Sequence, residues 1–294
     1  MPLPVVGSTE PSGPGKVTPD GRTKGDGAQP GAAQQDMGSG DYGLALAAKL
    51  AITAAFVVGA ARAAERAGPL IGAMVATLPI AAGPAYVFLA LDHDVGFIAA
   101  SALASLAANA ANMVFCTVHA AVAQSRGVAV SLAAALAAWI AVSVTAHSMD
   151  WTLFEAVLLN VVVFAACLAV SRKFRAVPMP PTIRRRYDVP LRAGMVAALV
   201  AAVVVLSSRV GPTVTGLLAL FPIVLISLIL IFQPRIGGRA TAALTANAVI
   251  GLGGFAAALV ALHVAVMPFG APAALVLALL VSIGCNFAVA IARR

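Results

Sequence analysis

The chain contains two related halves, and equivalent positions are 143 residues apart. This shift relates the following pairs: Gly68-Pro69 and Gly211-Pro212, Pro79-Ile80 and Pro222-Ile223, and Lys49 and Arg192. Each copy lies in strongly apolar sequence, and an odd number of apolar runs separates equivalent points. Two copies separated in this way face opposite directions across a membrane, as in many secondary transporters. The pattern therefore predicts an inverted repeat.

The composition indicates an integral membrane protein. Hydrophobic residues make up 61% of the chain and charged residues only 10%, whereas soluble domains carry about 25% charge. The apolar runs are close to the roughly 20 residues that a helix needs to cross a bilayer. We predict nine such helices, at residues 43–64, 69–91, 96–123, 127–147, 152–171, 191–208, 212–233, 239–266 and 271–291. The fold class expected is thus all-α, arranged as four helices, one linker helix and four helices.

The expected organisation follows from these runs. Residues 1–41 are rich in Gly, Pro, Gln and charges, so a disordered tail is expected. The first repeat is then 42–148, a linker helix with a basic cytoplasmic loop is 149–190, and the second, inverted repeat is 191–294. Lys and Arg are enriched in cytoplasmic loops. Most of the Lys and Arg residues of this chain fall on the cytoplasmic side when the N-terminus is outside and the C-terminus is cytoplasmic.

The prolines repeated in mid-helix are the first candidate site. Pro79 and Pro222 each remove a backbone hydrogen bond and break or kink a helix. In a membrane, such breaks are tolerated where neighbouring groups or a water-lined cavity satisfy the freed carbonyls. Residues around the two breaks are candidate substrate ligands: Thr77, Gly72 and Gly216. The alternative is a pair of ordinary proline kinks.

Polar residues within the spans are further candidates. Lys49 and Arg192 are expected to attract an anionic solute or a nearby carboxylate, or else to extend to the lipid headgroups. Asn112 and Asn247 are candidate solute ligands, and the alternative is hydrogen bonding between helices. His119, His263 and Glu155 are candidate proton-relay groups. Their positions near helix ends favour an interfacial role instead.

The sequence carries no motif of a known enzyme chemistry. It lacks a phosphate-binding P-loop, a Gly-x-Ser-x-Gly elbow and a His-Glu-x-x-His zinc motif. We therefore expect no catalytic residues, no metal, no cofactor and no nucleic-acid partner. The expected partners are the lipid bilayer and a small-molecule solute, and association of identical chains is left open.

The second half, from about residue 186 to 294, resembles the GlpM-like family of small four-helix bacterial inner-membrane proteins. The resemblance is carried by Arg192 and by the run Gly216-Leu217-Leu218-Ala219-Leu220-Phe221-Pro222, with weaker support from Arg239 and Thr241. The first half keeps only the outline of the motif. The resemblance implies a four-helix unit, here duplicated and inverted, in a bacterial inner membrane.

Two functions fit this sequence. The first is a secondary transporter or exporter of a small polar solute, anions included, that works by alternating access between the inverted repeats. The second is a non-transporting scaffold subunit of an envelope biosynthetic complex. The scarcity of titratable residues within the spans favours the second, because ion coupling then has no obvious carrier.

Overall fold

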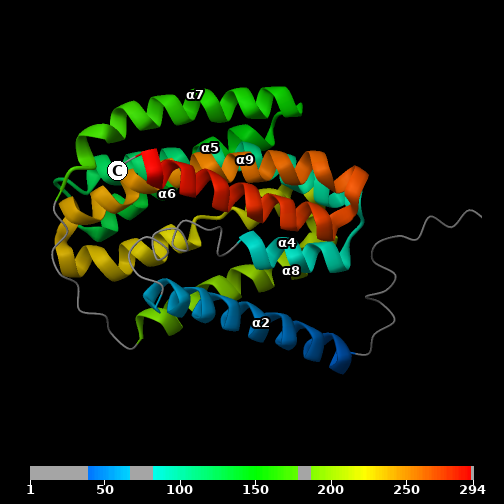
Figure 1. Ribbon diagram of the computed structural model, residues 1–294. Coiled ribbons are helices and arrows are strands. Elements are labelled where there is room, and N and C mark those ends of the chain that lie inside the picture. Colours follow the sequence, from blue (N-terminus) through cyan, green and yellow to red (C-terminus); the bar gives the residue numbers. More distant parts are fainter. Residues whose placement is uncertain (1–38, 67–81, 178–186, 293–294) are drawn as a thin grey trace, which may run out of the picture.

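The apolar runs fold into helices throughout the part of the chain that the structure, a computed structural model, describes: residues 39–66, 82–177 and 187–292. The all-α prediction is confirmed for these residues. The elements are α2 (Ser39–Arg66), α4 (Ala82–Asp92), α5 (Val95–Val122), α6 (Val128–His147), α7 (Leu153–Ser171), the short 3-10 helix η1 (Arg172–Phe174), α8 (Asp188–Ala219) and α9 (Ile223–Ala292), as Figure 1 shows.

Local signals in the sequence set where two of these helices begin. The carboxylate of Asp94 accepts a hydrogen bond of 2.8 Å from the backbone N–H of Phe97 and caps α5. Thr152 and Glu155 form a reciprocal capping box at the start of α7. Both arrangements satisfy backbone donors that a helix leaves free at its first turn.

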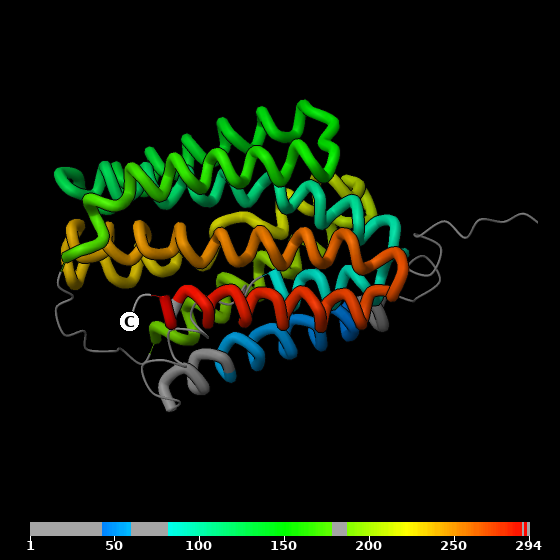
Figure 2. The backbone as a smooth tube through the Cα atoms, turned by 45° about the horizontal axis from the view of Figure 1, so that its top comes forward, coloured from blue at the N-terminus to red at the C-terminus, as the bar shows by residue number. Residues whose placement is uncertain are grey.

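Three glycines interrupt the two longest helices. Gly211, Gly237 and Gly270 have φ values of 74°, 82° and 76°, a region that glycine enters without steric cost. Gly211 divides α8, and Pro212 opens the stretch that follows it. Gly237 and Gly270 divide α9 into a first stretch (223–236), a middle stretch (238–269) and a last stretch (271–292). In Figure 2 the orange middle stretch and the red last stretch run side by side in opposite directions.

Helix α5 lies at the centre of the bundle. It contacts α6, α7, α8 and α9, and most of its residues are buried. Helix α7 lies along one side of the bundle, whereas α2 packs on α8 along the opposite side (Figure 1). The central helix is therefore the element that the rest of the fold surrounds.

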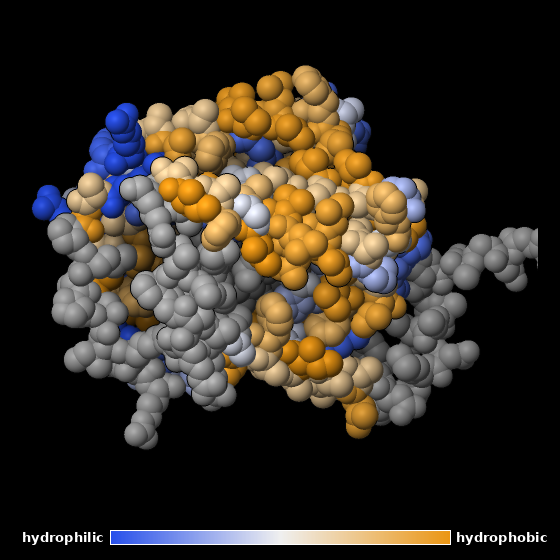
Figure 3. Space-filling model, in the orientation of Figure 1, coloured by the Kyte–Doolittle hydropathy of each residue, from blue (hydrophilic) through white to orange (hydrophobic). Residues whose placement is uncertain are grey.

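The long apolar helices are compatible with membrane insertion. Four helical segments among the described residues are long and apolar enough to cross a membrane: Val95–Val122, Val128–His147, Leu153–Phe174 and Asp188–Val289. The three glycine breaks fall in the predicted gaps between spans, but this count does not confirm nine helices. Figure 3 shows apolar side chains covering much of one face, with hydrophilic groups gathered toward the ends of the bundle.

Two predicted features fall largely beyond the described residues. The tail of residues 1–41 lies outside them except for its last three positions, and these are already helical because α2 begins at Ser39. The first-half break, with Gly72, Thr77 and Pro79, also lies outside them.

Candidate functional site

Helix α5 carries a row of buried polar side chains along one face. Ser101, Ser105, Asn109, Asn112 and His119 follow one another at spacings of three, four or seven residues, which places them on a single side of a helix. Their exposed fractions lie between 0% and 6%. We call these five residues the polar face of α5. Such a face is costly to bury in an apolar bundle unless each group finds a partner.

The break at Pro222 is held by this polar face. Helix α8 ends at Ala219 and α9 begins at Ile223, so the predicted break in the second half is present. The Asn112 side-chain amide donates to the Leu220 carbonyl at 3.0 Å. The Trp139 indole N–H donates to the Asn112 Oδ1 at 2.9 Å, and the Trp139 ring meets Phe221 edge-on at 5.2 Å. A carbonyl near the break is thus satisfied from α5, with α6 fixing the orientation of the amide.

One turn before the break, α8 approaches α5 at Gly216. The Ser105 hydroxyl donates to the Gly216 carbonyl at 2.8 Å, and the Tyr86 hydroxyl lies 2.6 Å from the same Ser105 oxygen. A Cβ atom at Gly216 would lie only 2.2 Å from the Ser101 carbonyl oxygen. Glycine is therefore required here for the two helices to come this close.

At the middle of α5, Asn109 connects three helices. Its amide donates to Asn160 Oδ1 on α7 at 3.0 Å and to the Leu252 carbonyl on α9 at 3.1 Å. Within the described part of the chain, the buried Asn109 Oδ1 and Ser101 Oγ have no hydrogen-bond partner. An unpaired buried acceptor costs about 1–3 kcal/mol. The polar face therefore keeps unused hydrogen-bonding capacity.

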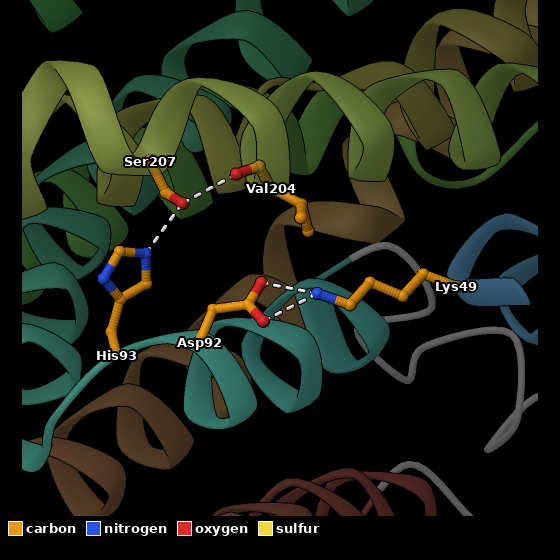
Figure 4. A network of polar contacts seen from close by, with 5 residues as sticks. All are labelled: Lys49, Asp92, His93, Val204 and Ser207. Carbon is orange, nitrogen blue, oxygen red and sulfur yellow. Dashed lines mark hydrogen bonds and ion pairs between the residues drawn. The ribbon is translucent and has the colours of Figure 1, made fainter. Parts of the chain in front are cut away.

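A polar network closes one end of the bundle, shown in Figure 4. The Lys49 ammonium on α2 contacts both carboxylate oxygens of Asp92 on α4, at 2.5 and 2.7 Å. The next residue, His93, lies 2.8 Å from the Ser207 hydroxyl on α8. This network joins α2, α4 and α8, and we call it the Asp92 cluster.

The Asp92 cluster fixes the tautomer of its histidine. The Ser207 hydroxyl has one proton and donates it to the Val204 carbonyl at 2.8 Å, so Nε2 of His93 donates to Ser207. Burial lowers the pKa of His93. Lys49 lowers it further, while Asp92 and Asp94 oppose the shift. The ring also stacks on Phe97 with centroids 3.8 Å apart. The folded surroundings of His93 thus disfavour its charged form.

A second network closes the other end of α5. His119 Nε2 donates to Gln233 Oε1 at 3.1 Å, and the Ser131 hydroxyl oxygen lies 3.2 Å from the same oxygen. We call these three residues the Gln233 cluster. Nearby on α9, the Arg235 guanidinium makes two 2.6 Å bonds to the Asp188 carboxylate on α8. Both ends of the bundle are tied by contacts between helices distant in sequence.

The structure brings some of the predicted site residues together and separates others. Gly216, Pro222, Asn112 and His119 lie along or against α5. Asn247 instead bonds the Ala243 carbonyl of its own helix at 2.8 Å. Arg192 is half-buried on α8, one turn after Asp188.

The three candidate proton carriers lie apart. His119 belongs to the Gln233 cluster, whereas His263 bonds the Ala99 carbonyl at 2.8 Å. Glu155 is exposed and takes part in the capping box with Thr152, the N-cap of α7, in line with the helix-end position expected for it. The residues do not form one continuous relay among the described residues.

Several residues of the site were not singled out from the sequence. Trp139, Ser105 and Ser207 give no signal there, because their roles depend on which helices become neighbours. The 143-residue shift does relate Asp92 to Arg235, but it relates Lys49 to another cation, Arg192. Asp188, which pairs with Arg235, corresponds to Ala45, so the shift does not identify the second ion pair.

Comparison with known proteins gives no family for this chain. No family model, curated protein or solved structure matches it. Among the described residues, no group of three or more His, Cys, Asp or Glu side chains is placed to hold a metal ion. What remains is a row of buried, polar side chains on α5, most of which bond groups on neighbouring helices.

Proposed function

We propose that this protein is a secondary transporter or exporter of a small polar solute, and that the polar face of α5 lines the solute's path. The observation that carries the proposal is that face itself: five buried polar residues with unused hydrogen-bonding capacity at Asn109 and Ser101. Intramembrane polar groups are rare and characteristically line substrate pathways. A passing solute supplies the partners that these atoms lack.

The contacts across the bundle support an inverted four-one-four repeat. Asn109 bonds Leu252, which is its own equivalent 143 residues later. Equivalent residues touch only where a two-fold axis passes between them. His119 lies against Thr245. His263 corresponds to it at a shift of 144, one residue more than elsewhere, and lies against Ala99. α5 and the middle stretch of α9 therefore cross in opposite directions. In this proposal the axis lies in the membrane plane, at Asn109.

The two end clusters act as gates in this proposal. With the N-terminus outside, the Asp92 cluster lies at the outer face and the Gln233 cluster at the cytoplasmic face of a bacterial inner membrane. Both are formed in this structure, which corresponds to an occluded state. Alternating access then opens one cluster at a time by rocking one half against the other.

The charges favour a neutral polar solute over an anion. Lys49 is paired with Asp92 and Arg235 with Asp188, so these two cations present little net charge to a solute. The polar face itself contains only hydroxyl, amide and imidazole groups. Hydroxyl- or amide-bearing solutes match those donors and acceptors.

Uptake into vesicles tests the proposal. Purified protein is reconstituted, and entry of labelled polyols, amides and organic anions is measured. We expect uptake of a neutral class of solute, strongly reduced by Asn109→Leu but retained by Asn247→Leu, because the Asn247 amide bonds the Ala243 carbonyl of its own helix. Absence of uptake by the unmodified protein across the panel contradicts transport.

The second candidate function is the non-transporting scaffold subunit. The closed networks at both ends and the paired cations favour it, because they describe a rigid bundle without an evident coupling ion. Co-purification of a stable membrane enzyme, whose activity falls when this protein is deleted, supports this alternative.

A further inference from the structure

A small apolar cavity lies outside the polar face, between α4 and two stretches of α9. Its volume is about 70 Å³. Tyr86 and neighbouring α4 residues form one wall, Phe255 and Ala258 of the middle stretch form another, and Ala278 and Leu279 of the last stretch form the third. The Tyr86 hydroxyl bonds Ser105 on α5, so this residue presents its ring rather than a free polar group to the cavity.

The place that the repeat relates to this cavity is filled. A shift of 143 residues relates Ala258 in the cavity wall to Phe115, which belongs to a buried core cluster. The cavity wall therefore has a methyl group where its counterpart has an aromatic ring. Part of the cavity is the space that this smaller side chain leaves.

The cavity reaches the apolar surface of the bundle. Leu279 in its wall is 45% exposed, and Val276 and Leu280 on the same helical stretch are 58% and 60% exposed. Figure 3 shows this side of the molecule covered by apolar residues. In a membrane, the medium next to such a surface is hydrocarbon, not water.

We propose that this cavity receives the acyl chain of a membrane phospholipid. Water is excluded from it, because a buried water needs two to four polar partners and the walls are apolar. An engineered protein cavity of roughly 150 Å³ holds benzene. The present cavity is about half that size, so it suits a flexible alkyl segment better than a ring. The site is separate from the polar face and does not depend on transport.

Photolabelling tests this site. The protein is reconstituted in phosphatidylcholine vesicles containing a trace of phosphatidylcholine with a diazirine on its acyl chain, and labelled residues are mapped by mass spectrometry. We expect insertion at buried wall residues Ala258 and Leu259, which are 3% and 2% exposed, as well as at exposed Val276. The exposed residue serves as the internal control for contact with lipid.

Two filling variants complete the test. Ala278→Leu and Ala258→Phe, the latter restoring the residue type of the filled counterpart, are expected to abolish labelling of Leu259 and leave that of Val276 unchanged. Ala278→Leu remains informative if the larger substitution does not fold. Labelling confined to exposed residues in the unmodified protein overturns the proposal, and so does labelling of Leu259 that persists in the filled variants.

Discussion

At the scale of single residues, the charged groups of the ion pairs Lys49–Asp92 and Arg235–Asp188 join neighbouring helices. The Lys49 ammonium lies 5.9 Å from the centre of the Phe88 ring and forms an ion pair with Asp92. A cation at this depth is costly unless it is paired. The pair therefore explains how a lysine is accommodated within an apolar helix.

Exchanging the two residues of the Lys49–Asp92 pair tests whether stability depends on the ion pair itself or on having a particular charge at each position. Lys49→Ala leaves the Asp92 carboxylate without its partner, and we expect a loss of about 1–3 kcal/mol, measured as a lower Tm of the purified protein. The double variant Lys49→Asp with Asp92→Lys restores an ion pair and recovers most of that loss. Equal destabilisation in the single and double variants contradicts a pairing role.

His93 makes stability depend on pH in one direction. Its folded-state pKa is lowered, chiefly by burial, while an unfolded histidine titrates near about 6.5. As pH falls below that value the unfolded state takes up the proton first, so this contribution to stability is present above it and lost below it. When the pH is lowered from 7.5 to 5, we expect the Tm of the His93→Gln variant to fall less steeply than that of the unmodified protein. Parallel Tm profiles for the two proteins are the contrary result.

At the scale of elements, the contact between α5 and α8 is set by a glycine and a broken helix. Gly216 brings the two backbones together, and Asn112 bonds the carbonyl exposed just before Pro222. Small residues permit this kind of approach in membranes, where burial from water supplies no drive between helices. The break and the close approach therefore support each other.

Gly216→Ala tests the close approach. The added methyl group overlaps the Ser101 carbonyl, and overpacking of this kind costs about 1–3 kcal/mol. Gly194→Ala is the matched control on the same helix, since a Cβ there meets no atom within 4 Å. We expect a lower Tm only for Gly216→Ala, and similar Tm values for the two variants contradict the contact.

The Asn112 amide is predicted to couple α6 to the helix break. Asn112→Leu leaves both the Leu220 carbonyl and the Trp139 N–H without their hydrogen-bond partner, whereas Trp139→Phe removes one hydrogen bond. We expect losses of about 1–3 kcal/mol for the first and less for the second. Because they share one network, the double variant should lose less than the sum. Strict additivity in a double-mutant cycle of unfolding free energies contradicts the coupling.

At the scale of the whole molecule, the proposed inverted repeat fixes which face each turn occupies. Cysteines introduced at Asp94 and at Ser125, both exposed, should react from opposite sides of intact inner-membrane vesicles. A membrane-impermeant maleimide should label the Asp94 position from outside and the Ser125 position only from the cytoplasmic side. The native thiols set the background. Labelling of both positions from one side rules out the proposed orientation.

The sequence predicted the helical class and the places where the longest helices break, because both depend on local composition. Runs of apolar residues require helices in lipid, and Gly211, Gly237 and Gly270 fall in the expected gaps. The site was predicted only in part. Asn112 and Gly216 stood out within apolar runs, but their partners Trp139 and Ser101 are set by helix packing, which no short stretch of sequence encodes.

Under the proposed membrane function, the glycine breaks in α9 bear on how the chain would be inserted during synthesis. The middle and last stretches run in opposite directions and meet at Gly270, with no intervening loop. Because no loop separates them, the last stretch leaves the ribosome directly after the middle stretch. We expect the two to leave the insertion machinery together as a hairpin, and a chain truncated after Gly270 to be degraded rather than stably inserted.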